Sequence, residues 1–234
     1  MGFSCKSEPE PALHQEKSET PDRGRFPVPP RQRPYELAIS IGFDALLAYE
    51  QTPERLATLG ASRQDAVIRL PALDQHLLID TAERAVRVEG HGEARHHWAL
   101  LALHYLSAGD LTEDPRKVTL AHFPDARGYL SVYNKRIIGR FLGTVGRTDA
   151  GFRQAAERVG ATPIAWSGAC YRFDVFPRLP ITFIRYDGDE ESPPGANIVY
   201  RADAGRLLPA EDRIVVAEVI IEILSGKPLY EGTG

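Results

Sequence analysis

Two strand-like runs separated by only two residues constrain the fold of this chain most. Residues 169–176 and 179–186 are rich in apolar and β-branched side chains, and only Pro177 and Arg178 connect them. A connection this short favours neighbouring strands that run in opposite directions, because a parallel crossover needs a dozen or more residues. The second run is the most apolar strand-like stretch in the chain, and it leads into an acidic turn. We therefore expect antiparallel pairing, and we look for chemistry where this strand meets the turn.

The last apolar run, residues 210–225, predicts a buried helix. Its Val and Ile content would also suit a strand, but sixteen residues exceed the usual strand length. A proline before the run, two acidic residues in its first turn and Gly226 after it are helix signals. Glu211, Glu218 and Glu222 make one narrow polar stripe. We therefore expect most of this helix to be buried against the sheet.

Hydrophobic periodicity predicts the remaining elements. The helical period appears in residues 34–49, 53–59, 93–108, 131–145 and 150–159, with Ser131 as an N-cap. Strand patterns appear in residues 66–70, 75–79, 85–88, 117–122 and 197–200, the second and third forming a hairpin. No internal repeat or boundary divides residues 34–230. The expected fold is a single α+β domain with a mixed or mostly antiparallel sheet and helices packed on it.

Residues 1–33 read as a proline-rich leader without apolar periodicity. A segment with so little to bury does not offset its own ordering entropy. We expect a disordered leader that is dispensable for folding; the alternative is a docking segment, since residues 26–30 suit a polyproline helix. The first residues lack the apolar core of a secretory signal, so the cytoplasm is the expected location.

Composition limits the partners and cofactors. The formal net charge of −4 offers no overall basic surface for nucleic acid. No apolar run approaches the roughly 18 residues of a membrane span. We therefore expect neither nucleic acid nor membrane as a partner, while the small-molecule or protein partner is unknown and a homodimer remains open. Cys5 and Cys170 cannot supply the thiolates of an iron–sulfur cluster. Zinc-type spacings and nucleotide-binding loops are absent, so the cofactor is unknown and no metal site is predicted.

The first candidate site is the acidic turn that follows residue 186. It holds Asp187, Asp189, Glu190 and Glu191 within five residues. Close carboxylates can raise one another's pKa and supply a general acid, or they can bind a hard cation such as magnesium. The alternative is a solvated turn whose side chains cap backbone groups or pair with arginine. All three interpretations remain open from the sequence.

The other candidate residues are His104, Tyr129 and Arg136. His104 is the histidine most suited to a half-buried functional position, whereas His97 lies seven residues away, too far along a helix to share a metal ion. Arg136 belongs to a basic group around the helix that begins near Ser131, and such a group can bind a phosphate or carboxylate. The alternative is a solvated basic face that pairs with the acidic turn.

Several of these segments together resemble a known family. Residues 180–194 (PITFIRYDGDEESPP), 197–200 (NIVY) and 207–212 (LLPAED) resemble the family catalogued as domain of unknown function 3786. His104, Tyr129 and Arg136 lie at further points of similarity, and the resemblance covers roughly residues 35–226. It implies no established activity. Some members carry an added cysteine-rich iron–sulfur module of the kind seen in corrinoid-protein systems, which implies a link to corrinoid or C1 metabolism; this chain lacks those cysteines.

Two functional hypotheses follow. The first is a non-catalytic binding or accessory module whose acidic turn and arginine-bearing helix line a ligand or partner surface. The second is a small enzyme that uses Asp189, Glu190 or Glu191 for acid–base or metal-assisted chemistry. An enzyme should gather these carboxylates with His104, Tyr129 or Arg136 around one concave pocket. A binding module needs only an exposed apolar or charged patch.

Overall fold

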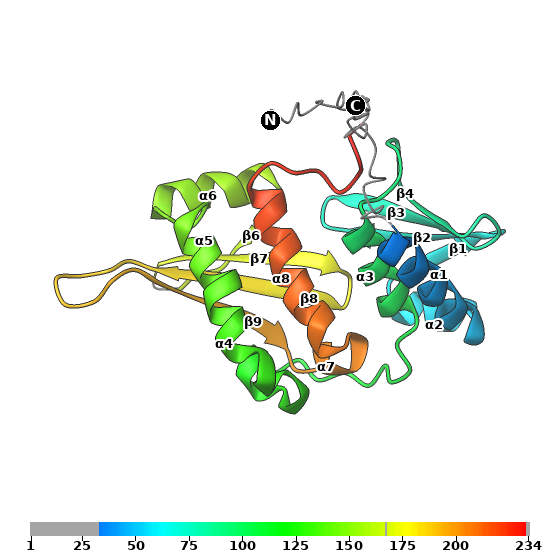
Figure 1. Ribbon diagram of the computed structural model, residues 1–234, viewed down its shortest axis with the longest axis horizontal. Coiled ribbons are helices and arrows are strands. Elements are labelled where there is room, and N and C mark those ends of the chain that lie inside the picture. Colours follow the sequence, from blue (N-terminus) through cyan, green and yellow to red (C-terminus); the bar gives the residue numbers. More distant parts are fainter. Residues whose placement is uncertain (1–32, 167, 233–234) are drawn as a thin grey trace, which may run out of the picture.

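The computed structural model describes residues 33–166 and 168–232 (Figure 1). The predicted leader, residues 1–33, lies outside this part of the chain except for Arg33, which begins the first helix. Within the described residues, none of the helices is both long and apolar enough to cross a membrane. Helices pack on two antiparallel sheets, so the predicted α+β fold class is confirmed. The division into a leader and a single domain stays a prediction.

The first part of the chain builds a four-stranded meander with three helices. Its strands pair in sequence order, and Asp80 and Ala85 close the hairpin expected between the last two. Thr52 caps the second helix by accepting a hydrogen bond from the backbone N–H of Arg55. The elements are α1 Arg33–Ala48, α2 Pro53–Thr58, β1 Ser62–Gln64, β2 Val67–Ala72, β3 Gln75–Asp80, β4 Ala85–Val88 and α3 His96–Leu106.

The second sheet has five strands in the order β5-β9-β8-β7-β6, all antiparallel. The expected hairpin is present, with Phe176 pairing with Leu179 across the turn. Side chains alternate between two faces, as in any strand. We call the face with Phe173 and Phe183 the inner face and the face with Ile184 the outer face. The strands are β5 Lys117–Thr119, β6 Thr162–Pro163, β7 Ala169–Phe176, β8 Leu179–Tyr186 and β9 Gly195–Arg201.

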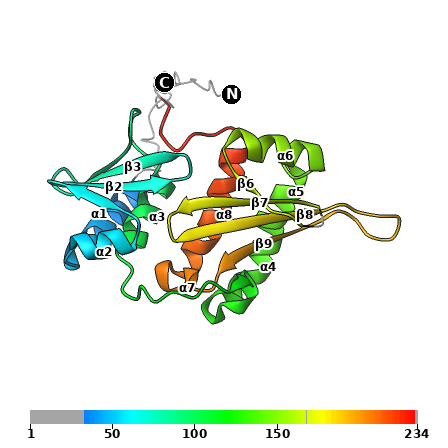
Figure 2. The same ribbon diagram turned by 180° about the vertical axis from the view of Figure 1, so that it is seen from behind.

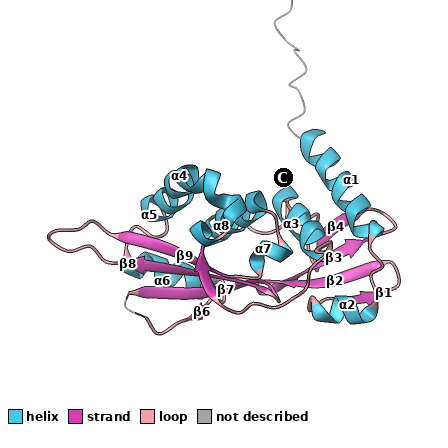
Figure 3. Ribbon diagram, turned by 90° about the horizontal axis from the view of Figure 1, so that it is seen from below, coloured by secondary structure: helices cyan, strands magenta, loops and turns pink. Residues whose placement is uncertain are grey.

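Helices cover the inner face of this sheet. Figure 3 shows α4, α5 and α8 together on one side of it. Aromatic side chains make the contact. The ring centroids of Phe141 and Phe183 lie 5.3 Å apart and those of Phe152 and Tyr171 lie 5.4 Å apart, and both pairs pack edge to face. Seen from behind, the strands lie in front of α8, and no described α-helix covers their outer face (Figure 2). The remaining segments are η1 Leu120–His122, η2 Pro124–Tyr129, α4 Leu130–Tyr133, η3 Asn134–Ile138, α5 Gly139–Gly143, α6 Asp149–Arg158, α7 Ala204–Leu207 and α8 Ala210–Leu224.

Helix α8 is the central support of the molecule, as its sequence predicts. It lies between α4–α5 and α3 (Figure 1), and Val216, Ile220 and Leu224 are among its fully buried side chains. Its few polar side chains still find partners. The carboxylate of Glu222 is almost buried and binds both Arg95 and Lys227. Burying a charge without such partners would be strongly unfavourable, so the charged residues of α8 are tied to the elements beside it.

The two sheets share one hydrophobic core. Phe176 of β7 packs against Trp98 and Tyr105 of α3, with ring centroids 6.3 and 4.9 Å apart. The Tyr105 hydroxyl donates a hydrogen bond to the Leu59 carbonyl and accepts one from the backbone N–H of Arg178. The turn between β7 and β8 is therefore fixed against the helices of the other sheet.

Two of the expected elements differ from their predictions. The strand predicted over residues 117–122 is only three residues long, because Leu120 turns into the core and begins a 3-10 turn. Ser131 does not cap a helix, since it lies inside α4 and the chain already turns through η2 before it. The helix predicted over residues 131–145 also contains a π-helical segment, Asn134–Ile138, which periodicity alone does not reveal.

Candidate functional site

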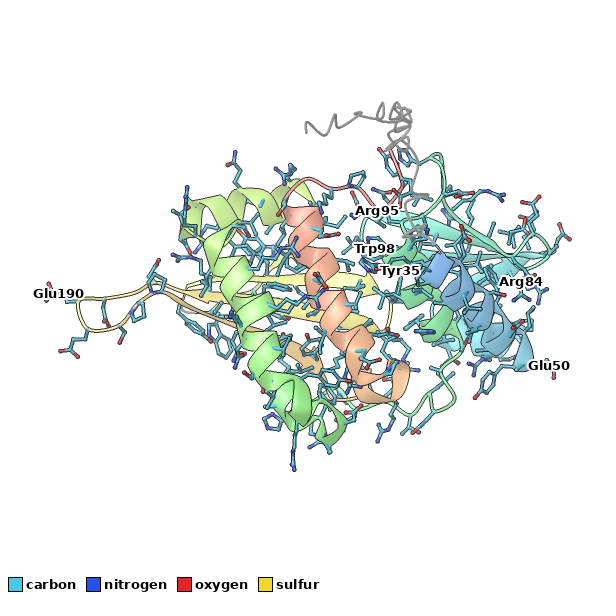
Figure 4. The ribbon with its side chains drawn as sticks, viewed as in Figure 1. Tyr35, Glu50, Arg84, Arg95, Trp98 and Glu190 are labelled. Carbon is cyan, nitrogen blue, oxygen red and sulfur yellow. The ribbon has the colours of Figure 1, made fainter. Side chains whose placement is uncertain are left out.

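The predicted acidic site is the turn between β8 and β9. The turn projects away from the body of the protein, with Glu190 near its outer end (Figure 4). Asp187 binds the buried guanidinium of Arg185 at 2.5 Å. Asp189 Oδ1 accepts hydrogen bonds from two backbone N–H groups of the turn, at 2.9 and 2.7 Å. Glu190 and Glu191 are exposed. Two of the four carboxylates thus stabilise the turn itself, and two lie in solvent.

The three other predicted site residues lie beside α8, and each pairs with an acidic residue of that helix. These pairs tie α3 and the η2–α5 segment to the two sides of α8. The partners lie far apart in the sequence, 108 residues in the first pair and 82 in the other two. The Nδ1 of His104 lies 2.5 Å from Asp212 Oδ2, the Tyr129 hydroxyl donates to Glu211 Oε1 at 2.6 Å, and Arg136 donates to Glu218 Oε2 at 2.8 Å.

These pairs favour the protonated form of each titratable partner. The hydrogen bond to Asp212 raises the pKa of His104 and outweighs burial, which lowers it. The hydrogen bond to Glu211 likewise raises the pKa of Tyr129. A raised pKa makes each group a weaker acid and favours its protonated form. Each pair also ties a neighbouring segment of the chain to α8.

The structure does not bring the seven predicted residues into one site. Arg136 binds Glu218 rather than the acidic turn, and the space enclosed by the turn is lined by residues 187–194 of the turn itself. His104 and Tyr129 lie beside α8 instead. Among the described residues, no three His, Cys, Asp or Glu side chains are placed to hold a metal ion. The arrangement is one exposed turn and one separate row of pairs along α8.

A hollow that the sequence analysis did not predict lies on the outer face of the five-stranded sheet. We call it the outer-face hollow; its volume is about 250 Å³. The strand register forms its floor: Thr182 lies beside Val199, and Ile184 lies between Asn197 and Cys170. Three adjacent strands thus contribute one continuous surface, and no described α-helix covers it (Figure 2).

The walls of the outer-face hollow come from the two edges of the sheet. Lys117 and His122 stand on the β5 side, and the imidazole Nδ1 of His122 lies 3.3 Å from the Thr119 hydroxyl. Trp166 stands on the β6 side and is 57% exposed, the largest exposed aromatic surface among the described residues. Tyr186 closes the end from which the acidic turn departs. The hollow has an apolar floor, one aromatic wall and one wall with cationic and hydrogen-bonding groups.

The thiol at the floor of the hollow is not poised as a nucleophile. Cys170 is only 3% exposed, and burial raises its pKa, although the nearby Lys117 ammonium acts in the opposite direction. The thiolate is the reactive form of cysteine, so a raised pKa keeps this side chain an apolar neutral group. Cys170 therefore contributes surface to the hollow.

One signal in the sequence could have indicated the outer-face hollow. A sheet face in water usually carries polar side chains at every second position. In β8 the outward positions are Thr182, Ile184 and Tyr186, and in β9 Val199 is outward, so the alternation is weak. Strand β8 therefore carries apolar side chains on both faces, although described α-helices cover only its inner face.

A larger hollow of about 440 Å³ lies between α1 and the four-stranded sheet. Its lining includes three carboxylates, those of Glu36, Glu93 and Glu231, together with Arg84 and His96. These charged walls favour water over an apolar ligand. We therefore regard the outer-face hollow as the better binding site.

The fold and this hollow define an α+β protein of two antiparallel sheets with an open, partly apolar sheet face. Comparison with known families gives the more specific identity. The chain belongs to the family described as Domain of unknown function (DUF3786), whose model matches residues 51–223. The match includes both sheets and the whole outer-face hollow, whereas α1 precedes it. No curated protein and no solved structure matches the chain.

Proposed function

We propose that this protein is a non-catalytic binding module that holds a small, flat, largely apolar molecule with an anionic group in its outer-face hollow. The observation that carries the proposal is the apolar floor of that hollow, on which no described α-helix packs (Figure 2). Ile184 and Cys170 are the sort of side chains that a sheet normally buries under a helix, and here they form the base of a concave surface. Ligand sites are typically concave and apolar with a few polar groups that fix orientation.

The walls specify the chemistry of the ligand. Trp166 offers a flat aromatic surface against which a planar group can stack. Lys117 stands across the hollow on the β5 side, where its ammonium suits a carboxylate or sulfonate. Asn197 and Thr182 add hydrogen-bonding groups in the floor. A planar molecule with one anionic end matches this arrangement.

The enzyme hypothesis has less geometric support. It requires the acidic carboxylates to meet a histidine or arginine around one pocket, and the residues around the acidic turn belong to the turn itself. The predicted link to corrinoid or C1 metabolism, the cytoplasmic location and a homodimer stay predictions.

The proposal can be tested with the fluorescent probe 1-anilinonaphthalene-8-sulfonate, which is aromatic and anionic. We expect one probe molecule to bind per native chain. The substitution Thr182→Trp should fill the hollow and weaken binding by about tenfold or more, which corresponds to about 1.4 kcal/mol. The measurement is a fluorescence titration, accompanied by a melting curve for each variant.

A matched control uses the exposed apolar face of α1. Leu37 is exposed there, far from the outer-face hollow in the sequence and outside the family match. The substitution Leu37→Ser should leave probe affinity within about twofold. Unchanged binding to a folded Thr182→Trp variant, or loss of binding in Leu37→Ser instead, would reject the hollow as the site.

A further inference from the structure

Arg178, in the turn between β7 and β8, has a buried guanidinium without hydrogen-bond partners. The residue is only 6% exposed. Its Nε and both terminal nitrogens are buried, and none has a hydrogen-bond partner among the described residues. The backbone is held in place, because the Arg178 N–H donates to the Tyr105 hydroxyl at 3.2 Å. The guanidinium is thus fixed in a position where all its donors are unsatisfied.

Such a group needs a physical explanation. A buried donor without a partner lowers the stability of the fold, and a charged donor lowers it more. The nearest carboxylates are those of Asp203 and Glu113, whose oxygens lie 3.6 and 3.8 Å from the Arg178 nitrogens. These distances provide charge balance but exceed those of hydrogen bonds.

Asp203 lies beyond hydrogen-bond distance of Arg178, and its oxygens already accept three other hydrogen bonds. This fully buried carboxylate accepts two bonds from Arg201, at 3.0 and 2.6 Å, and one from the backbone N–H of Asp114. The fork of Arg201 and the carboxylate of Asp203 form a bidentate pair. Arg178 lies beside this pair as an additional positive charge.

Glu113 shows where an oxyanion fits beside the two arginines. Its Oε1 lies 3.8 Å from Arg178 Nε, and its Oε2 lies 3.7 Å from an Arg201 terminal nitrogen. The Glu113 side chain is 66% exposed, on the loop between α3 and β5. Its carboxylate therefore lies over both guanidinium groups without a hydrogen bond to either, and it remains largely in solvent.

We propose that Arg178 and Arg201 form a binding site for an oxyanion, a carboxylate or phosphate group, and that the Glu113 side chain occupies this site until the oxyanion displaces it. With Glu113 displaced, two guanidinium groups face one buried carboxylate, which leaves one positive charge for the ligand. Guanidinium donors match carboxylate and phosphate oxygens in geometry. None of these residues lines the outer-face hollow, so the proposal is independent of the proposed function.

The test compares two substitutions that remove the same charge from exposed side chains. Glu113→Gln removes the competing carboxylate, and Glu190→Gln removes a carboxylate from the acidic turn. Inorganic phosphate and acetate are titrated separately into each full-length variant by calorimetry, with sodium chloride holding the ionic strength constant. We expect Glu113→Gln to bind at least one of the two probes about fivefold more tightly than the native chain, and Glu190→Gln to match the native chain. The probe that responds identifies the oxyanion.

A further variant tests the guanidinium fork. Arg178→Lys keeps the charge but removes the planar donors, and it should weaken binding of the responding probe about fivefold or more. Equal affinities in Glu113→Gln and Glu190→Gln, for both probes, would overturn the proposal, as would unchanged binding by a folded Arg178→Lys variant. If Arg178→Lys does not fold, the comparison of the two glutamate variants decides.

Discussion

The two ends of β8 both carry clustered charges, but the charges are exposed to solvent at one end and buried at the other. At the end that leads to β9, the acidic turn extends into solvent, and Asp187 and Asp189 bind partners within or next to the turn. At the other end, Arg178 and Asp203 are buried, and the Arg178 guanidinium lacks hydrogen bonds among the described residues. The acidic turn is the more conspicuous cluster in the sequence, yet its carboxylates have ordinary partners. The buried guanidinium of Arg178 is the group that lacks them.

This contrast shows that charge density along a sequence is a poor guide to chemistry. Exposed carboxylates in a turn have water and nearby N–H groups as partners, so clustering them is inexpensive in free energy. A buried guanidinium is shielded from water, so a missing hydrogen-bond partner makes its burial unfavourable. Burial and satisfaction of hydrogen bonds therefore distinguish the two ends, and neither quantity is visible in the order of residues.

The largest expected effect is at the buried end. Replacing Asp203 with Ala removes the acceptor for Arg201 and for the backbone N–H of Asp114, and it leaves two guanidinium groups without a buried counter-charge. Removing one partner of a buried pair typically lowers the free energy of unfolding by about 3–5 kcal/mol. Urea unfolding of the native and Asp203→Ala proteins measures this difference in the free energy of unfolding. A loss below about 1 kcal/mol would show that the buried charges are better solvated than their burial indicates.

An intermediate effect is expected from the pair of His104 and Asp212 beside α8. Because the folded-state pKa of His104 is raised above its unfolded value, the pair stabilises the fold fully below the unfolded pKa. That stabilisation is lost as the pH rises through the folded pKa. The loss should be about 1 kcal/mol or less, since the imidazole is partly exposed and screened by solvent.

The control for this pH dependence is Asp212→Asn. It should lower stability below the unfolded pKa of His104 and flatten the fall in stability as the pH rises through the folded pKa, because the charged partner of His104 is gone. Urea unfolding at a series of pH values provides the comparison. An unchanged profile in Asp212→Asn would assign the dependence to another group.

The smallest expected effect is at the exposed end. Replacing both Asp189 with Asn and Glu190 with Gln should change the free energy of unfolding by no more than about 0.5 kcal/mol. Asn keeps a carbonyl oxygen that can accept the turn hydrogen bonds made by Asp189, and Glu190 is exposed. Thermal melting suffices for the measurement. A destabilisation of 1 kcal/mol or more would mean that the turn supports the fold, and the contrast between the two ends would fail.

Sequence patterns predicted the elements whose formation is decided locally. The hairpin of β7 and β8 follows from two apolar runs and a two-residue turn, and α8 follows from its length and end signals. Very short elements were missed. Strand β6 has only two residues and α7 only four, too few to show a period, and their formation depends on neighbouring segments.

The candidate sites were less predictable, because they depend on distant contacts. His104 and Asp212 lie 108 residues apart, and nothing in the local sequence of either indicates the other. The floor of the outer-face hollow depends on the register of three strands, which places Ile184 between Asn197 and Cys170. A weak alternation of polar and apolar residues is the only local trace of such a floor.

The short edge strands of the five-stranded sheet have a consequence for aggregation. A sheet that leaves an apolar face uncovered risks adding strands from other molecules at its edges. Here β5 is three residues long and begins with Lys117, and β6 is two residues long and contains Pro163, which lacks an N–H to donate. Neither edge offers a useful template for another strand. The five-stranded sheet can therefore leave its outer face without a covering helix and still resist the addition of strands at these two edges.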